Sequence, residues 1–336
     1  MKVFIKSIST YLPSNSLTNE QLNMYFPEWS VDKISSKTGI YQRSIANSEE
    51  FSCDMAISAA TKLFAENNIQ PMDIDFVILC TQSPDYFLPT TACIIQDKLG
   101  IPTSAGAFDF NLGCSGYVYG LAISKGLIAS GIAKNILFIT SETYSKFIHP
   151  ADKSNRTIFG DGATATLISN EPGFAEILEF DLGTDGKGAE NLIVKRGGMR
   201  FPKNDNSEVV FDEYGNARNE NYLYMNGTEI FNFTSLMVPK LVENVLSKNK
   251  LLLEEVDLHI FHQANKFMLN HLRKKLSIKE EKFFIDIEDC GNTVCSTIPI
   301  AINKALNTSN INKGENVLLA GFGVGYSWGG CIIKFQ

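Results

Sequence analysis

A lone thiol at position 114 stands where a nucleophile would be expected. Cys114 belongs to Asp109-Phe110-Asn111-Leu112-Gly113-Cys114-Ser115-Gly116, which follows a strand-like run and enters an apolar helical stretch over 117–129. At a helix N-terminus the unpaired backbone N–H groups and the positive end of the dipole favour a thiolate. We therefore expect a reactive cysteine, and the alternative is an inert buried thiol, as most free cysteines are.

Two further polar side chains have the chemistry to act with this cysteine. His262 is one of four histidines and ends an apolar run over 256–262, and ligands bind at the carboxyl ends of strands in open α/β sheets. Asn292 lies in Gly291-Asn292-Thr293, where its amide can donate to a developing oxyanion. The alternatives are a structural histidine and a helix N-cap, which asparagine favours.

A third glycine-rich turn, Gly321–Tyr326, is expected to bring backbone N–H groups to the same place. A phosphate-binding loop is the competing interpretation, but the Lys-Ser/Thr ending of a Walker A motif is absent.

Helical and strand-like segments alternate, and their order repeats. In the first half, helical stretches over 53–67 and 115–129 precede apolar runs over 75–80 and 135–140. The second half contains a helical stretch over 228–248, a strand over 256–262, a segment over 284–292 that enters a helix through 305, and a strand over 315–320. Asp75 to Cys114 spans 39 positions and Asp257 to Asn292 spans 35, so the two turns match. The pattern predicts an α/β fold of two duplicated halves with a site between them, and chance similarity is the alternative.

We place the N-terminal half, which bears the cysteine, at 1–172, and the C-terminal half, which bears the histidine and the asparagine, at 173–336. The segment over about 183–222 is polar and rich in Gly, Asn and charged residues. It is expected to leave the core as a surface hairpin or a cover over the active site.

Composition excludes several classes of protein. The chain has 336 residues, of which 44% are hydrophobic and 20% charged, which is typical of globular proteins. Seven cysteines without C-x-x-C spacing predict reduced thiols and no metal site. A net charge of −7 argues against general nucleic-acid binding. Because residues 1–10 lack a signal-peptide pattern and no apolar run reaches about 18 residues, we expect a soluble, cytoplasmic protein with no membrane insertion.

Six motifs in order resemble one known family. They are the Asp109–Gly116 segment, Phe159-Gly160-Asp161-Gly162-Ala163, Tyr224-Met225-Asn226-Gly227, His262-Gln263-Ala264-Asn265, Gly291-Asn292-Thr293 and the glycine-rich stretch from Gly321 to Gly329. Together they resemble the β-ketoacyl-acyl-carrier-protein synthase III family of thiolase-like condensing enzymes, almost end to end. The resemblance implies a homodimer with a thiolase-like α/β fold, layered αβαβα with mixed five-stranded sheets. It also implies no cofactor, with thioesters of coenzyme A or acyl carrier protein as substrates.

The resemblance assigns roles to the residues singled out above. Cys114 would take the acyl group, and His262 and Asn292 would hydrogen-bond the thioester carbonyl of malonyl-acyl carrier protein as carbon dioxide leaves. The backbone N–H groups of Cys114 and Val324 would form the oxyanion hole. Val324 stands where this family commonly has glycine, which leaves the N–H in place but alters the local shape.

Several positions for substrate binding depart from the family. Counted from Lys37-Thr38-Gly39-Ile40, Lys33 falls where a tryptophan stacks on the adenine of coenzyme A, and Lys153 falls on its arginine partner. Weak coenzyme A binding or priming from a carrier-bound acyl group becomes plausible. Leu88 replaces a phenylalanine of the partner subunit's acyl pocket, which hints at a longer or branched acyl group. Lys33, Lys37, Lys153, Leu88 and Asn265 are thus the candidate substrate-binding residues.

The expected carrier-docking surface also differs. Phe267 replaces an arginine associated with docking, while Lys266, Arg273, Lys274 and Lys275 lie on the same expected helix. Because carrier proteins are acidic, such a basic face would steer them, and an ordinary solvated helix face is the alternative.

The leading hypothesis is acyl transfer to Cys114 followed by decarboxylative Claisen condensation with malonyl-acyl carrier protein. The alternative is an acyltransferase of the same fold that acylates an amine or hydroxyl without forming a carbon–carbon bond. Hydroxymethylglutaryl-type synthesis is disfavoured because Thr81–Pro89 offers only Asp85 as an acid or base. A non-catalytic partner subunit is disfavoured because all three polar side chains are present.

Overall fold

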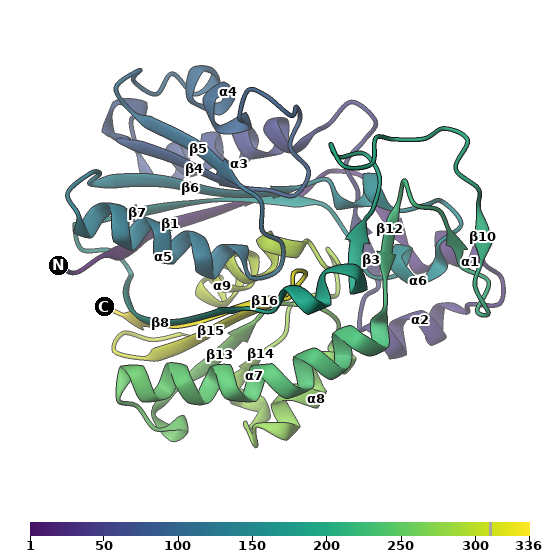
Figure 1. Ribbon diagram of the computed structural model, residues 1–336. Coiled ribbons are helices and arrows are strands. Elements are labelled where there is room, and N and C mark those ends of the chain that lie inside the picture. Colours follow the sequence, from purple (N-terminus) through teal and green to yellow (C-terminus); the bar gives the residue numbers. More distant parts are fainter. Residues whose placement is uncertain (309–310) are drawn as a thin grey trace.

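Ten strands from both halves of the chain form the framework of this computed structural model, which describes residues 1–308 and 311–336 (Figure 1). The first half supplies β1 (Phe4–Tyr11), β4 (Phe76–Cys80), β5 (Gly106–Phe110), β6 (Asn135–Glu142) and β7 (Gly162–Ser169). The second half supplies β8 (Ala175–Thr184), β13 (Leu258–Phe261), β14 (Phe283–Phe284), β15 (Asn316–Gly323) and β16 (Ser327–Phe335).

The two sets of strands have the same order and the same directions. The first is arranged β5-β4-β6-β7-β1 and the second β14-β13-β15-β16-β8. In each set the three strands farthest from the junction are parallel and the remaining pairings are antiparallel. The duplication predicted from the sequence is therefore confirmed. Two residue pairs, Phe4 with Glu176 and Ile5 with Ala175, join the two expected five-stranded sheets into one ten-stranded sheet.

Helices lie in three layers around these strands (Figure 1). The outer layers are α3 (Ser52–Asn67) with α4 (Thr91–Lys98), against the first half, and α7 (Gly227–Asn249) with α8 (Lys266–Lys275), against the second. The middle layer consists of α5 (Gly116–Ala129) and α9 (Thr297–Asn307), which contact strands of both halves. The order is αβαβα, as expected.

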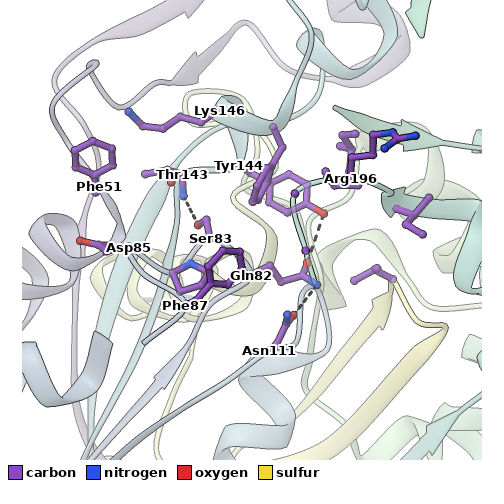
Figure 2. Close-up of a pocket in the computed structure, with 18 of the residues that line it drawn as sticks. Phe51, Gln82, Ser83, Asp85, Phe87, Asn111, Thr143, Tyr144, Lys146 and Arg196 are labelled. Carbon is purple, nitrogen blue, oxygen red and sulfur yellow. Dashed lines mark hydrogen bonds between the residues drawn. The ribbon is translucent and has the colours of Figure 1, made fainter. Parts of the chain in front are cut away.

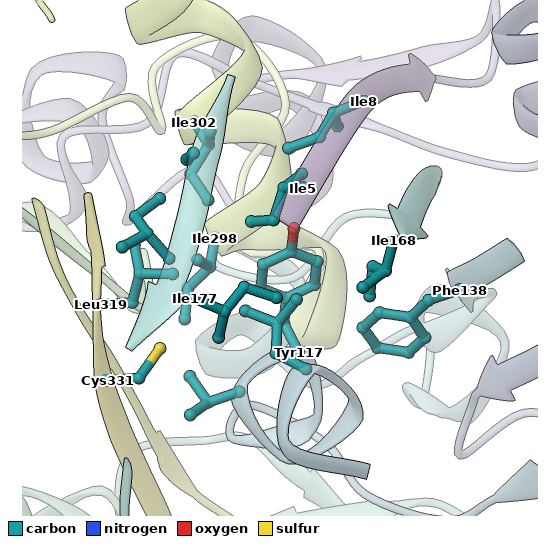
Figure 3. Packing of buried hydrophobic residues seen from close by; sticks show 14 of the residues in the cluster. Ile5, Ile8, Tyr117, Phe138, Ile168, Ile177, Ile298, Ile302, Leu319 and Cys331 are labelled. Carbon is teal, nitrogen blue, oxygen red and sulfur yellow. The ribbon is translucent and has the colours of Figure 1, made fainter. Parts of the chain in front are cut away.

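The middle layer forms because its two helices carry apolar residues on several faces. Tyr117 from α5 and Ile298 and Ile302 from α9 are fully buried between strands of the two halves (Figure 3). The close approach of α5 to β6 also requires a glycine at position 120, because a Cβ on Gly120 would lie 2.0 Å from the ring of Phe138. The helix that follows Cys114 is thus fixed by packing on both sides.

Short elements surround one end of the framework. They are β2 (Ser16–Thr18), α1 (Asn19–Tyr25), α2 (Val31–Thr38), β3 (Gln42–Ser44), α6 (Lys153–Arg156), β9 (Leu192–Val194), β10 (Val210–Phe211), β11 (Ala217–Arg218) and β12 (Leu223–Met225). Within the polar excursion over about 183–222, β10 pairs with β11, and β9 pairs with β12, which directly follows the excursion; both pairings are short and antiparallel. No helix in the described ranges is long and apolar enough to cross a membrane.

Candidate active site

Cys114 lies in the tight turn between β5 and α5, with 7% of its surface exposed. The N–H of Gly116 closes this turn on the carbonyl of Gly113 at 2.8 Å. Strand β15 passes against the cysteine because it has glycine there: a Cβ on Gly323 would lie 2.8 Å from Sγ, and one on Gly321 would lie 2.7 Å from the Cys114 carbonyl oxygen. The sulfur is therefore held between a turn of the first half and a strand of the second.

Burial controls the ionisation of this thiol. Loss of solvent raises the pKa of Cys114 to about 12, with the buried carboxyl of Glu142 adding to the rise. The backbone N–H groups of Val324 and of Cys114 itself act in the opposite direction, because both lie against the sulfur. The expectation of a favoured thiolate is wrong for the free thiol, since α5 begins at Gly116 and desolvation outweighs the helix terminus.

His262 follows the end of β13 and is 1% exposed. Its backbone N–H continues the strand by donating to Ala320 at 2.8 Å, and Phe322 presents its ring edge-on to the imidazole at 5.8 Å. Its Nδ1 lies 2.7 Å from the hydroxyl oxygen of Thr297. Burial lowers the pKa of His262 to about 3, so the imidazole is neutral.

Asn292 is 4% exposed and is held by backbone from the first half of the chain. Its N–H donates to the carbonyl of Ile158 at 2.9 Å, and its own carbonyl accepts from the N–H of Gly160 at 3.0 Å. Its Oδ1 accepts the N–H of Val294 at 2.9 Å, while Nδ2 lies 3.4 Å from the carbonyl of Ala264. A 3₁₀ turn over Val294–Ser296, with Thr293 at its N-cap, leads into α9, which begins at Thr297. Asn292 is therefore not an N-cap, although its Oδ1 accepts the first N–H of that turn.

Val294 brings the three side chains to one place. Its N–H is bound by Asn292, and its carbonyl lies 3.0 Å from the Thr297 hydroxyl, which contacts His262. The Val294 side chain packs in the same buried cluster as Cys114. Its φ of 56° is left-handed, an unfavourable conformation for a β-branched residue that often marks functional sites. The matching turns of the two halves therefore converge around this residue.

A cavity of about 880 Å³ opens beside Val324, whose N–H lies against the sulfur of Cys114. Figure 2 shows Gln82 in its wall between Tyr144 and Asn111, with hydrogen bonds of 3.4 and 3.2 Å. The polar excursion contributes Leu192–Val194 and Arg196–Gly198 to the lining, so it borders the site as well as the surface. Cys114, His262 and Asn292 are not among the residues that line it, and Val324 is the lining residue that connects the cavity with Cys114. The cavity is large enough to hold an acyl chain.

Comparisons with known proteins agree on one family. Residues 108–186 match the family described as 3-oxoacyl-[acyl-carrier-protein (ACP)] synthase III, and residues 246–335 match its C-terminal region. A β-ketoacyl-[acyl-carrier-protein] synthase III of Clostridium perfringens is 38% identical over 96% of both chains. One from Clostridium tetani is 37% identical over 99% of this chain and 98% of its own. This chain belongs to the β-ketoacyl-[acyl-carrier-protein] synthase III family.

A solved structure shows the same relationship in three dimensions. The crystal structure of a 3-oxoacyl-(acyl-carrier-protein) synthase III superposes on this family member with a TM-score of 0.97. Its sequence is 49% identical, and the match covers 100% of both chains. The thiolase-like fold expected from the sequence is thereby confirmed.

One candidate coenzyme A position of this synthase III family member, Lys33, lies against a tryptophan that the sequence reasoning missed. Trp29 directly precedes the N-cap of α2, and Nζ of Lys33 lies 5.1 Å above its ring. Lys153 is tied to the carboxylate of Glu28. Lys37 is exposed in the last turn of α2. An aromatic face is therefore present one helical turn before the position that the gapless count identified.

Two other candidate substrate-binding residues lie apart from the cavity lining. Leu88 is 82% exposed, although its neighbours Tyr86 and Phe87 line the cavity. Asn265 caps α8, where its Oδ1 accepts the N–H of Met268 at 2.8 Å.

The expected docking helix is only partly a free basic face. Lys274 is exposed, Lys266 pairs with Glu288 at 3.5 Å, and Lys275 donates to Ser235 at 3.0 Å. Arg273 is largely covered, with 15% of its side chain exposed, and pairs with Glu280 at 3.5 Å. Phe267 is 64% exposed and packs against the ring of Phe231 at 5.8 Å. This surface therefore combines an aromatic pair with the flanking lysines.

Two carboxyl groups near the site have different roles. Asp85 accepts a hydrogen bond from the N–H of Cys53 near the start of α3, at 3.1 Å. The only acidic residue of the loop over Thr81–Pro89 therefore makes a structural contact. Glu142, the last residue of β6, is fully buried close to Cys114 and was missed. The available signal was a glutamate two positions after the apolar run over 135–140.

Proposed function

We propose that this chain is a condensing enzyme that works through an acyl-cysteine. The observation that supports this best is the set of contacts through Val294 that links His262, Asn292 and the buried cluster of Cys114, together with Val324, which packs on that cluster and lines a cavity large enough for an acyl chain. A thiol nucleophile alone would transfer an acyl group. The two buried neutral donors beside it are suited to a second step in which negative charge develops on a thioester oxygen.

In the first step, Sγ of Cys114 attacks the carbonyl carbon of an acyl thioester. A sulfur–carbon bond forms to the cysteine, the bond to the departing thiol breaks, and the cysteine proton leaves with that thiol. The N–H groups of Cys114 and Val324 would stabilise the oxyanion of the tetrahedral intermediate, and their interaction with the sulfur supports this role.

In the second step, malonyl-acyl carrier protein loses carbon dioxide and the remaining electron pair spreads onto its thioester oxygen. His262 and Asn292 would donate hydrogen bonds to that oxygen. The imidazole of His262 is neutral, so it can donate from Nε2 only when Nε2 carries the ring proton. The carbanion then attacks the acyl-cysteine, a carbon–carbon bond forms, and the sulfur leaves as thiolate. The proposed reaction needs no resident cofactor.

Other features of the proposal concern partners and organisation. We propose that the enzyme is a homodimer, with the exposed Leu88 available to the partner subunit's acyl pocket, and that its two domains are 1–172 and 173–336. Acyl-coenzyme A or acyl-carrier thioesters would serve as donors, with Lys33, Lys37, Lys153 and Asn265 at the entrance. Lys266, Arg273, Lys274 and Lys275 would face the carrier protein. Location in the cytoplasm stays a prediction.

Single substitutions test the mechanism. Cys114→Ala should abolish the acyl-enzyme adduct seen by intact mass, while His262→Ala and Asn292→Ala should still acylate but release no carbon dioxide from malonyl-carrier. Cys93→Ala is the matched control, because Cys93 is an exposed free cysteine away from the site. Condensation by the Cys114→Ala variant would exclude the proposal.

Transfer of the acyl group to an amine or hydroxyl was the alternative, and no feature of the site favours it over condensation. Product masses with and without malonyl-carrier separate the two reactions. A product that lacks the two-carbon extension would support the alternative.

A further inference from the structure

We propose that Thr297 is a positioning residue that sets the tautomer of His262: its hydroxyl donates to Nδ1 and so leaves the imidazole proton on Nε2. This inference rests on the proposed function, since a donor at Nε2 matters only if that nitrogen faces a developing oxyanion. According to this inference, one hydroxyl group at the start of α9 decides which ring nitrogen of His262 carries the proton.

Three buried groups compete for protons at this point. The hydroxyl oxygen of Thr297 lies 2.7 Å from Nδ1 of His262 and 3.0 Å from the carbonyl oxygen of Val294. The backbone of Val294 also acts on the imidazole, where it opposes the fall in the pKa of His262. Val294, Thr297 and His262 are 0%, 3% and 1% exposed, so the choice of partner is made among these groups.

A hydroxyl has one proton to donate, and a neutral imidazole has one N–H. If the Thr297 hydroxyl donates to the Val294 carbonyl, the imidazole must donate to the hydroxyl oxygen from Nδ1. The ring proton is then on Nδ1, and Nε2 carries no proton and can only accept a hydrogen bond. If Thr297 donates to Nδ1, the ring proton is on Nε2, which can then donate to a substrate oxygen. Only the second arrangement suits stabilisation of a thioester enolate.

The Val294 carbonyl by itself favours the unproductive arrangement. A carbonyl oxygen is only an acceptor, so without the hydroxyl it would hold the proton on Nδ1. The left-handed backbone at Val294, with φ of 56°, directs the N–H to Asn292 and the carbonyl to the Thr297 hydroxyl, 2.7 Å from Nδ1 of His262. Thr297 is the group that can reverse this preference, because it alone among the three can donate to Nδ1.

The test compares Thr297→Val, which keeps the shape and removes the hydroxyl, with Thr297→Ser, which keeps it. Acyl-enzyme formation by intact mass should change less than about threefold in either variant, which also reports folding. Release of carbon dioxide from malonyl-carrier by the preformed acyl-enzyme should fall on the order of 100-fold in Thr297→Val, the effect of losing one oxyanion donor, and return in Thr297→Ser.

A second readout is independent of the reaction. The chain has four histidines, so ¹⁵N-histidine labelling with single substitutions assigns the His262 ring. The native enzyme should show the proton on Nε2, and Thr297→Val should show it on Nδ1. A native ring protonated on Nδ1, or unchanged decarboxylation in Thr297→Val, would overturn the inference. Failure of the native enzyme to make a carbon–carbon bond would instead refute the proposed function.

Discussion

Glu142 is a buried carboxyl group that has hydrogen-bond donors but no positively charged partner among the described residues. It is 0% exposed and accepts hydrogen bonds from the Gln82 N–H at 2.8 Å, the Ser83 hydroxyl at 2.8 Å and the Cys295 thiol at 3.4 Å. None of the ion pairs found among the described residues includes it. Burial raises the pKa of Glu142 from 4.5 to about 8 despite these donors. Replacement by glutamine should therefore change how stability depends on pH.

The sign follows from proton binding. Because the folded protein holds this proton more tightly than the unfolded chain, the group's contribution to stability is complete below pH 4.5 and is lost as pH rises through about 8. At about 1.4 kcal/mol per pKa unit, the shift corresponds to an upper limit of about 5 kcal/mol. Relaxation of the site reduces this, so we expect Glu142→Gln to gain about 2–4 kcal/mol relative to the native protein between pH 5 and pH 9.

Urea unfolding at both pH values, at one protein concentration, measures this difference. At pH 5 the variant should be similar to the native protein or slightly less stable, and at pH 9 it should be more stable. Glu171→Gln is the control, because that glutamate is exposed and pairs with Lys6 on the surface at 2.7 Å. An identical stability difference at pH 5 and pH 9 would show that Glu142 does not titrate with a raised pKa.

Three further predictions concern the site. Gly323→Ala should slow acyl-enzyme formation at Cys114 at least about tenfold, because the new Cβ would lie 2.8 Å from the sulfur. Gly126→Ala is the control and should leave the rate unchanged, because no atom lies within 4 Å of its Cβ position. Intact-mass measurements on reactions stopped at successive times compare the two rates. Trp29→Ala should raise KM for coenzyme A thioesters about fivefold, the loss of roughly 1 kcal/mol of stacking, and leave acyl-pantetheine kinetics unchanged. Phe267→Arg should lower KM for an acidic carrier protein several-fold without affecting malonyl-pantetheine, and an unchanged KM would place docking elsewhere.

The sequence was sufficient to predict the framework because apolar periodicity reports burial directly. The helices over 53–67 and 117–129 became α3 and α5 almost to the residue, and the repeated order of segments gave the duplicated halves. The sequence predicts a strand over 256–262, but β13 covers only Leu258–Phe261, the four residues that pair with β15. His262 nonetheless keeps one backbone bond to β15, which fixes its position.

Electrostatics could not be predicted in the same way. The expected low pKa of Cys114 followed from its position along the chain next to a helix start, whereas burial by residues from distant segments and the Glu142 carboxyl raise this pKa in the folded protein. Likewise, a gapless count identified Lys33 and missed the ring of Trp29, which lies four positions earlier and just before α2. Both errors arise because side-chain environment is set in three dimensions.

The way Asn292 is held explains why the two halves act as one catalytic unit. The segment that contains Phe159 and Gly160 belongs to the first half, yet it forms a bridge with Asn292 and bonds both its N–H and its carbonyl. Gly160 must be glycine for this contact, because a Cβ would lie 2.2 Å from the carbonyl oxygen of Cys290. Conversely, glycines of β15 in the second half seat Cys114 of the first. Backbone of the first half therefore holds Asn292 of the second, and backbone of the second half holds Cys114 of the first, so neither candidate site residue is positioned by its own half alone.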